Sequence, residues 1–89
     1  MEDLINSFPA PDTAKKAALE LVNRLDHGMW EWYEGASSVE GSIFIEFKTY
    51  QHRIYIEVLP DGSIEVETCD LFFQRIKIER FEKAADFSL

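Results

Sequence analysis

The sequence predicts an α+β fold: one N-terminal amphipathic helix packed on a four- to five-stranded antiparallel β-meander. Two observations predict it. An early segment spaces its apolar residues three and four apart, as a helix with one buried face does, and later segments alternate apolar with polar residues, as half-buried strands do. Of the 89 residues, 46% are hydrophobic, which is material for a single core.

The helix is predicted at residues 13–26. Its apolar positions follow the spacing i, i+3, i+4, i+7, i+8 and i+11, which forms one continuous stripe along a helix. The stripe consists of Ala14, Ala17, Ala18, Leu21, Val22 and Leu25. Asp12 is suited to cap the first turn, and Gly28 is suited to end the helix.

The prolines and the pattern divide the chain into three parts. Pro9 and Pro11 favour an extended lead-in over residues 1–11. The single α+β domain is then expected to span residues 12–80. Residues 81–89 are expected to form a C-terminal tail.

Five segments read as strands. The first, residues 30–32, alternates weakly, and the glycine- and serine-rich residues 34–42 that follow it are expected to form a loop. The other four place isoleucine, valine or phenylalanine at every second position. They are residues 43–48, 53–58, 64–67 and 75–79. Phe47 and one of Phe72 and Phe73 are expected in the core.

Turn chemistry and parity predict how the strands pair. Pro60-Asp61-Gly62 is typical of a three-residue hairpin loop with a left-handed glycine. In each hairpin we accept only the registers that keep charges out of the apolar face, because a one-residue slip exchanges the two faces. A two-residue loop at Gln51-His52 passes this test. The expected pairs are Leu59 with Ser63, Val58 with Ile64, Ile56 with Val66, Phe47 with Ile56, Ile45 with Val58, Glu67 with Arg75, Glu65 with Lys77 and Val66 with Ile76.

These registers gather acidic residues on the sheet face away from the helix. Glu46, Glu57 and Glu65 are expected side by side in one row, and Glu67 is expected beside Tyr55 in the next. Like charges directly opposite each other oppose sheet formation. Two interpretations remain open: a solvated surface on which acids outnumber bases, or a surface for a basic partner.

A second candidate patch is aromatic and acidic. Trp30, Trp32, Glu31 and Glu34 lie together ahead of the glycine-rich segment. Tryptophan is enriched at binding hot spots, but the same residues would also suit a position at the edge of the core. Both interpretations remain open from the sequence.

Catalytic, metal and phosphate motifs are not recognisable. The chain has one cysteine, Cys69, which is expected to be a small buried side chain, and two histidines, His27 and His52, which are expected at the surface. They do not form the short ligand spacings of metal sites, and the four glycines form no phosphate loop. We therefore expect neither an enzyme nor a cofactor or metal.

Charge and length limit the class of partner. A net charge of −8 repels nucleic acid and anionic membranes and favours a protein partner with a basic surface. The chain has no apolar run near the ~20 residues of a membrane span. A lone thiol and an acidic N-terminus predict a cytoplasmic protein, in the host cytoplasm if the protein is viral.

In size, charge and lack of catalytic residues, the chain resembles the small acidic proteins by which phages and mobile elements disarm host nucleic-acid enzymes. The resemblance implies a non-enzymatic inhibitor or modulator that occupies the basic, nucleic-acid-binding site of a host enzyme such as a defence nuclease. The alternative is a homo-oligomeric assembly module that uses the exposed sheet face or edge. Phe44, Tyr50 and Tyr55, which are expected to face away from the helix, could then lie in a homodimer.

Overall fold

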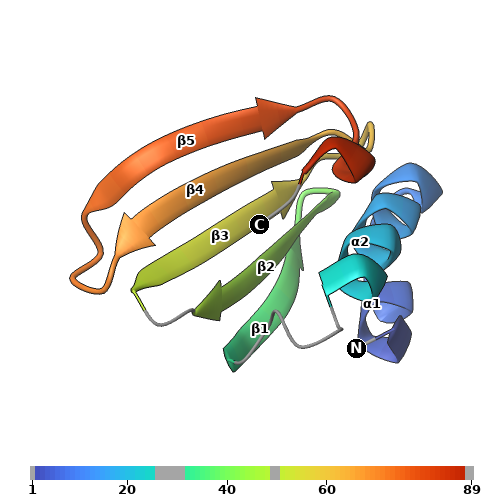
Figure 1. Cartoon of the computed structure of the whole chain (residues 1–89). Coiled ribbons are helices and arrows are strands. Elements are labelled where there is room, and N and C mark those ends of the chain that lie inside the picture. The colour runs from blue at the N-terminus through green and yellow to red at the C-terminus, as the bar shows by residue number, and fades with distance from the viewer. Residues whose placement is uncertain (1, 26–31, 49–50, 88–89) are drawn as a thin grey trace.

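The structure, a computed structural model, describes the backbone of residues 2–25, 32–48 and 51–87 and the side chains of residues 3–24, 37–48 and 51–87. Five antiparallel strands follow one another in the order β1-β2-β3-β4-β5, with two helices at the N-terminus and a short 3₁₀ helix at the C-terminus (Figure 1). The elements are α1 (Glu2–Ser7), α2 (Asp12–Leu25), β1 (Trp32–Val39), β2 (Ser42–Lys48), β3 (His52–Val58), β4 (Ile64–Asp70), β5 (Arg75–Phe81) and η1 (Ala84–Asp86). The predicted fold class is confirmed.

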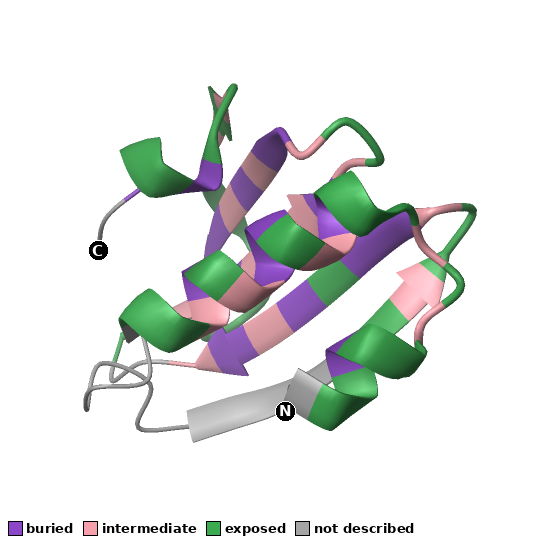
Figure 2. Cartoon of the chain, turned by 90° about the vertical axis from the view of Figure 1, so that its right-hand side faces the viewer, coloured by how far each residue is buried: buried purple, intermediate pink, exposed green. Residues whose placement is uncertain are grey.

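Helix α2 covers one face of the sheet, and the buried residues lie where the two meet (Figure 2). It begins at Asp12, one residue before the predicted start, so that Asp12 lies in the first turn and does not precede it; of the five strands, α2 packs mainly on β2 and β3. Leu21 is fully buried there and Val22 is half-buried; Leu25's side chain, Gly28 and His27 lie outside the described residues. The core consists of Ile5, Ala14, Ala17, Ala18, Leu21, Ile43, Ile45, Phe47, Ile54, Ile56, Val58, Ile64, Val66, Ala84 and Phe87. No helix in the described part of the chain is long and apolar enough to cross a membrane.

The N-terminal segment differs from the prediction. Residues 1–11 were expected to be extended, but Glu2–Ser7 forms α1, and Ile5 on it is fully buried in the core. A proline restricts its own residue and the one before it. Pro9 therefore ends the helix near Phe8 and does not prevent a helical turn further upstream.

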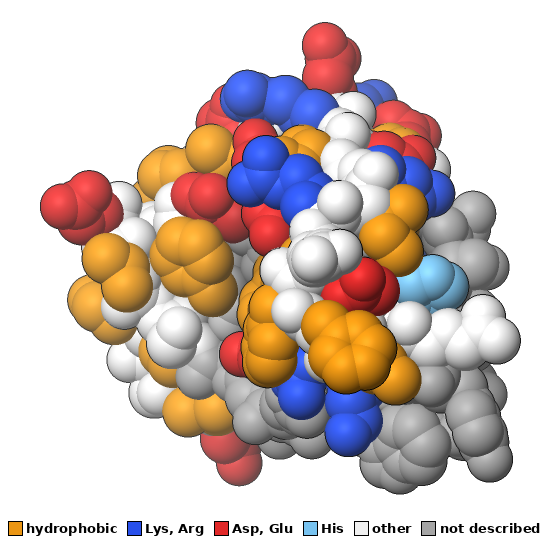
Figure 3. All heavy atoms as spheres, turned by 90° about the vertical axis from the view of Figure 1, so that its left-hand side faces the viewer, with side chains coloured by type: hydrophobic (Ala, Val, Ile, Leu, Met, Phe, Trp, Pro, Cys, Tyr) orange, Lys and Arg blue, Asp and Glu red, His pale blue; other side chains and the backbone are white. Residues whose placement is uncertain are grey.

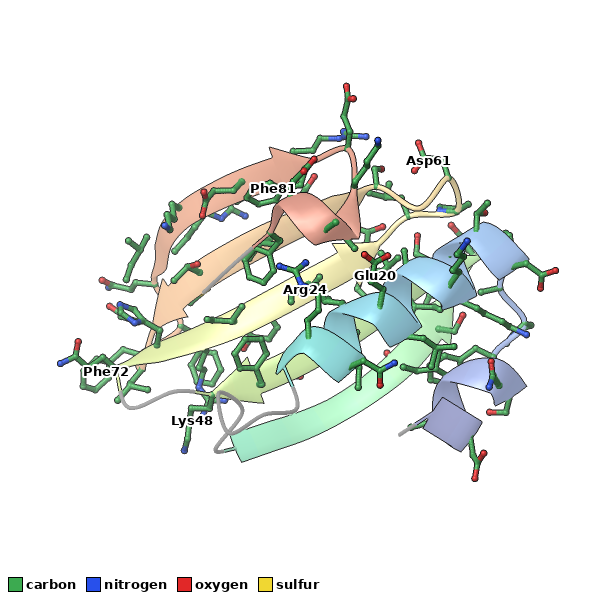
Figure 4. All side chains as sticks on the ribbon, turned by 45° about the vertical axis from the view of Figure 1, so that its right-hand side comes forward. Glu20, Arg24, Lys48, Asp61, Phe72 and Phe81 are labelled. Carbon is green, nitrogen blue, oxygen red and sulfur yellow. The ribbon has the colours of Figure 1, made fainter. Side chains whose placement is uncertain are left out.

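The C-terminal segment, expected as a tail over residues 81–89, packs back on the domain as far as it is described. Ala84 and Phe87 are buried, and the Phe81 and Phe87 rings meet edge to face with centroids 5.6 Å apart. Arg24 points from α2 towards this segment (Figure 4) and donates hydrogen bonds to the carbonyl oxygens of Ala84 (2.7 Å) and Phe87 (2.6 Å). The guanidinium thereby joins α2 to the segment after β5, and Ala84 O also accepts a hydrogen bond from Phe87 N (3.2 Å).

The loop predicted at residues 34–42 is mostly strand. β1 runs to Val39 and turns at Glu40 and Gly41, whose φ angles of 53° and 84° are those of a two-residue type I′ hairpin. An edge strand is held by main-chain pairing and needs no apolar alternation, so its glycines and serines do not exclude it. The strand predicted at residues 30–32 lies outside the described residues except for Trp32.

The predicted pairing of β2 with β3 is wrong by two residues. Phe47 pairs with Ile54 and Ile45 with Ile56, and the turn between the two strands includes residues 49 and 50, which lie outside the described residues. A shift of two keeps every side chain on its face. The apolar pattern could not distinguish the two registers.

The β3–β4 hairpin is as predicted: Ile56 pairs with Val66, and Gly62 has a φ of 89°. The β4–β5 hairpin is not. The three-residue loop between Asp70 and Gln74 moves the register by two residues, and a bulge between Thr68 and Cys69 moves it by one more, so that Val66 pairs with Glu79 and not with Ile76. One extra residue exchanges the faces, and the isoleucines of β5 therefore point away from the helix. Phe72 and Phe73, of which one was expected in the core, are both exposed in the connecting loop.

Candidate functional site

The sheet face turned away from α2, here called the open face, carries the acidic residues that the sequence singles out. Figure 3 views the molecule from the side away from the helices, where acidic, basic and hydrophobic side chains lie intermixed. Two rows cross this face from β2 to β5. One consists of Phe44, Glu57, Glu65 and Arg80, and the next consists of Glu46, Tyr55, Glu67 and Ile78.

Glu57 and Glu65 stand directly opposite each other on neighbouring strands, as predicted. Ser42 Oγ donates a hydrogen bond of 3.0 Å to Glu57 Oε2. Within the described part of the chain, neither carboxylate lies within ion-pair distance of a lysine or arginine, although Arg80 is the register partner of Glu65. The pair is therefore a site of negative charge without an ion pair to a described lysine or arginine.

Glu46 does not stand in that row, which corrects the prediction. The two-residue shift between β2 and β3 puts Phe44 beside Glu57 and moves Glu46 opposite Tyr55. Tyr55 in turn stands opposite Glu67, so the phenol lies between two acidic residues. Burial, and after it the charge of Glu46, raises the pKa of Tyr55, which keeps its hydroxyl neutral.

Glu67 is the best satisfied of these acids. Its Oε2 lies 3.4 Å from Arg75 Nη2, and its Oε1 lies 3.3 Å from Cys69 Sγ, which donates to it. Cys69 is only 2% exposed although it belongs to the open face, so the prediction of a buried cysteine is confirmed. Burial, and then the hydrogen bond to Glu67, raises the pKa of the thiol. A raised thiol pKa makes a poor nucleophile at neutral pH.

The open face is hollowed at its centre. A concavity of about 460 Å³, open to solvent, brings the four predicted acids together with Tyr55. Its lining is Ser37, Phe44, Ile45, Glu46, Tyr55, Ile56, Glu57, Glu65 and Glu67. We call it the acidic groove. The sequence placed Phe44 on this face but did not connect it with the acids; the correct β2–β3 register would have done so.

The aromatic patch of Trp30, Glu31, Trp32 and Glu34 lies outside the described side chains, as does Tyr50. A different hollow, along α2, is lined by Lys16, Glu20, Asn23 and Arg24, where two basic residues outweigh one acid. Among the described residues, no three histidine, cysteine or acidic side chains are arranged to hold a metal ion. The acidic groove is thus the strongest candidate site on the described surface.

Chemically, the acidic groove offers acceptors and aromatic rings. Carboxylates accept short charge-assisted hydrogen bonds from arginine and lysine, often two at once from a guanidinium. The faces of Phe44 and Tyr55 could stack with such a cation.

No family model, no curated protein and no solved structure matches this chain.

Proposed function

We propose that the protein is a non-enzymatic binding protein whose acidic groove docks on a basic surface of another protein. Following the sequence-based expectation, the favoured partner is a nucleic-acid-handling enzyme whose basic site the protein occupies as an inhibitor or modulator. The observation that carries the proposal is the directly opposed pair of Glu57 and Glu65, which has no cation of the described chain within ion-pair distance.

The opposed pair is unfavourable for the isolated protein. Like charges directly across a sheet are destabilising, whereas a pair of opposite charges there contributes about 0.2–1 kcal/mol of stability, so a lysine at either position would favour the folded protein. A guanidinium or ammonium group from a partner, placed between the two carboxylates, converts the repulsion into two charge-assisted hydrogen bonds. The gain is therefore realised only on binding.

The shape of the groove favours side chains of a protein over an enclosed small molecule. Small-molecule sites bury most of the ligand's surface, whereas this groove lies open on the face of a sheet and includes the exposed ring of Phe44. Beside the acids, Phe44 and Tyr55 provide flat surfaces of the kind on which an arginine packs. An arginine on the convex surface of a partner fits both features.

The field of the whole protein supports the same partner. A net charge of −8 attracts basic surfaces from a distance and speeds their association at low salt. Sites that bind nucleic acid are basic because they neutralise phosphates. An acidic protein that reaches such a site first would compete with the nucleic acid for it.

The proposal is tested by association kinetics with two double charge reversals. Glu57→Lys with Glu65→Lys changes the acidic groove, and Glu20→Lys with Glu82→Lys makes the same change in net charge at exposed residues of α2 and of the segment after β5. With an immobilised arginine-rich peptide as the basic probe, we expect the groove variant to associate about 10-fold more slowly at low salt and the control variant to associate nearly as fast as wild type. Equal slowing of both variants would show that net charge alone attracts the probe, and no slowing of the groove variant would refute the proposal.

A further inference from the structure

The outer side of β5 is an open sheet edge. β5 is the last strand in the order β1-β2-β3-β4-β5, and no strand of the described chain pairs with its outer side. Alternate residues of such a strand turn unpaired N–H and C=O groups outwards, where another strand can bind them. Its first four residues, Arg75 to Ile78, and Arg80 are exposed.

Exposed hydrophobic side chains gather at this edge. Of the eight large hydrophobic residues that are exposed in the described chain, five lie between positions 71 and 78. They are Leu71 (42%), Phe72 (84%), Phe73 (63%), Ile76 (54%) and Ile78 (42%). Figure 4 places Phe72 at the tip of the β4–β5 hairpin. A concentration of this kind is typical of an interaction surface, because scattered single residues would need no explanation.

The charges on β5 alternate in sign along one face. Lys77 Nζ and Glu79 Oε1 lie 3.0 Å apart, on side chains that remain 58% and 40% exposed. Ile78 lies between them on the opposite face. Charged residues commonly protect an edge against pairing, but here the two signs are spaced so that one register of self-pairing satisfies both.

We propose that β5 pairs antiparallel with β5 of a second copy of the chain, with Ile78 opposite Ile78 on a two-fold axis. Antiparallel pairing about a two-fold axis perpendicular to the sheet keeps each face continuous, so that one residue of the strand pairs with itself. An axis at Lys77, Glu79 or Arg80 sets like charges opposite each other. An axis at Ile78 instead sets isoleucine against isoleucine and forms Lys77–Glu79 pairs on both sides of it.

A two-fold axis at Ile76 is excluded for the same reason, since it would set Arg75 of one copy opposite Lys77 of the other. The bulge between β4 and β5 also disturbs that end of the strand and leaves the part from Lys77 to Phe81 regular. Charge complementarity therefore selects one occupant and one register. The two copies would form a continuous sheet with both acidic grooves on the same side, and the dimer itself does not depend on what the grooves bind.

Sedimentation of the full chain over about 5–500 µM tests the proposal. We expect the wild type to self-associate, and we expect Glu79→Lys and Lys77→Glu each to weaken self-association at least tenfold, because each sets like charges opposite each other. An equimolar mixture of the two variants should recover the dimer, since lysines at both positions then face glutamates. A wild type that stays monomeric over this range would overturn the proposal, as would variants that dimerise like wild type or a mixture that stays monomeric.

Disulfide formation tests the register independently. In the proposed dimer, the Cα atoms of Ile78 and its symmetry mate lie about 4.5–5.5 Å apart, within the range that a disulfide spans. Ile78→Cys should therefore cross-link under mild oxidation. Arg80→Cys is the matched control on the same exposed edge, because its symmetry mate lies about 13 Å away along the strand, beyond disulfide reach. Cross-linking of the control but not of Ile78→Cys would show that a different register forms, and cross-linking of neither would exclude the paired edge.

Discussion

Gly62 occupies the position in the β3–β4 hairpin where the chain must turn with a positive φ, and we expect its replacement by valine to destabilise the protein by about 2–3 kcal/mol. The loop is closed by hydrogen bonds from Leu59 N to Ser63 O (2.8 Å) and from Gly62 N to Leu59 O (2.9 Å). With a φ of 89°, Gly62 is in a region that β-branched residues resist.

The magnitude follows from the surroundings of Gly62. A Cβ atom at this position would lie 3.5 Å from Thr13 O and 3.9 Å from Ala17 Cβ, which are ordinary contacts. The cost is therefore one of backbone conformation, about 1–2 kcal/mol for a residue with a side chain, reduced for alanine by the lower entropy of its unfolded state. We expect a loss of about 1 kcal/mol for Gly62→Ala and a smaller one for Gly62→Asn, since asparagine tolerates positive φ.

Urea denaturation of the three variants measures these losses, and each 1 kcal/mol should also lower Tm by about 4–8 °C in a domain of this size. A loss below about 0.5 kcal/mol for Gly62→Val, the level of an ordinary surface site, would refute the reasoning. Asparagine no better than alanine would also refute it, because the order of the variants depends on φ alone.

The β4–β5 hairpin provides an internal comparison. It repeats the same loop, with hydrogen bonds from Asp70 N to Gln74 O (2.9 Å) and from Phe73 N to Asp70 O (3.1 Å), but its left-handed residue is Phe73, with a φ of 66°. The Arg53 guanidinium lies 4.3 Å from the centre of the Phe73 ring. Phe73→Gly therefore relieves the backbone but removes a cation–π contact, and we expect its net effect to be much smaller than that of Gly62→Val.

Three further predictions follow from buried or hydrogen-bonded groups. Leu21→Ala should lower the free energy of unfolding by about 2–5 kcal/mol in urea denaturation, because this side chain of α2 is fully buried against the sheet. A loss as small as that of a surface residue would show that α2 does not pack there. Hydrogen bonds from the hydroxyl and N–H of Ser63 hold the pKa of Asp61 below its ordinary 3.8, so its stabilising effect is present above that value and is lost as pH falls through the lowered pKa. The free energy by which wild type is more stable than Asp61→Asn should thus decrease in acid. An increase would contradict the stabilising hydrogen bonds from Ser63 to the Asp61 carboxylate. Glu67→Gln should lower the raised pKa of Cys69 and speed thiol labelling at alkaline pH, whereas an unchanged rate would exclude the hydrogen bond between them.

The elements beneath α2 could be predicted because burial on one face gives a strand a readable period. β2, β3 and β4 all place their isoleucines and valines towards the helix. The alternation of apolar and polar residues determines which face of the sheet each side chain occupies, but it does not distinguish two registers that differ by two residues. Pro60-Asp61-Gly62 resolved that ambiguity for one hairpin, and Gln51-His52 has no comparable turn chemistry for the other.

The isoleucines of β5 were predicted to face α2 but face away from it. The prediction was wrong because α2 does not extend over this strand. The parity test assumes that apolar residues face a covering layer, and this helix packs mainly on β2 and β3. Ile76 and Ile78 could therefore face away from it. Recognising the loop from Asp70 to Gln74, which has the same length as the loop from Leu59 to Ser63, would have moved the register by two residues and kept the faces. The bulge between Thr68 and Cys69, which exchanges the faces, has no comparable signal in the sequence.

The candidate site could be predicted in part for the same reason. The opposition of Glu57 and Glu65 follows from the well-determined β3–β4 hairpin alone, and it is present in the structure. Glu46 depended on the uncertain β2–β3 register and has a different neighbour, although it still lines the acidic groove. The concavity itself depends on the twist of the whole sheet, which no local pattern encodes.

The most direct test of the acidic groove as a binding site is an NMR titration of the ¹⁵N-labelled full chain with an arginine-rich peptide. If the groove binds basic side chains, the largest shift changes should fall on Phe44, Tyr55, Glu57 and Glu65 and should disappear in the Glu57→Lys, Glu65→Lys variant. The largest changes would contradict that account if they fell on acidic residues outside the groove, such as Glu20 or Glu82, or if they persisted in the variant.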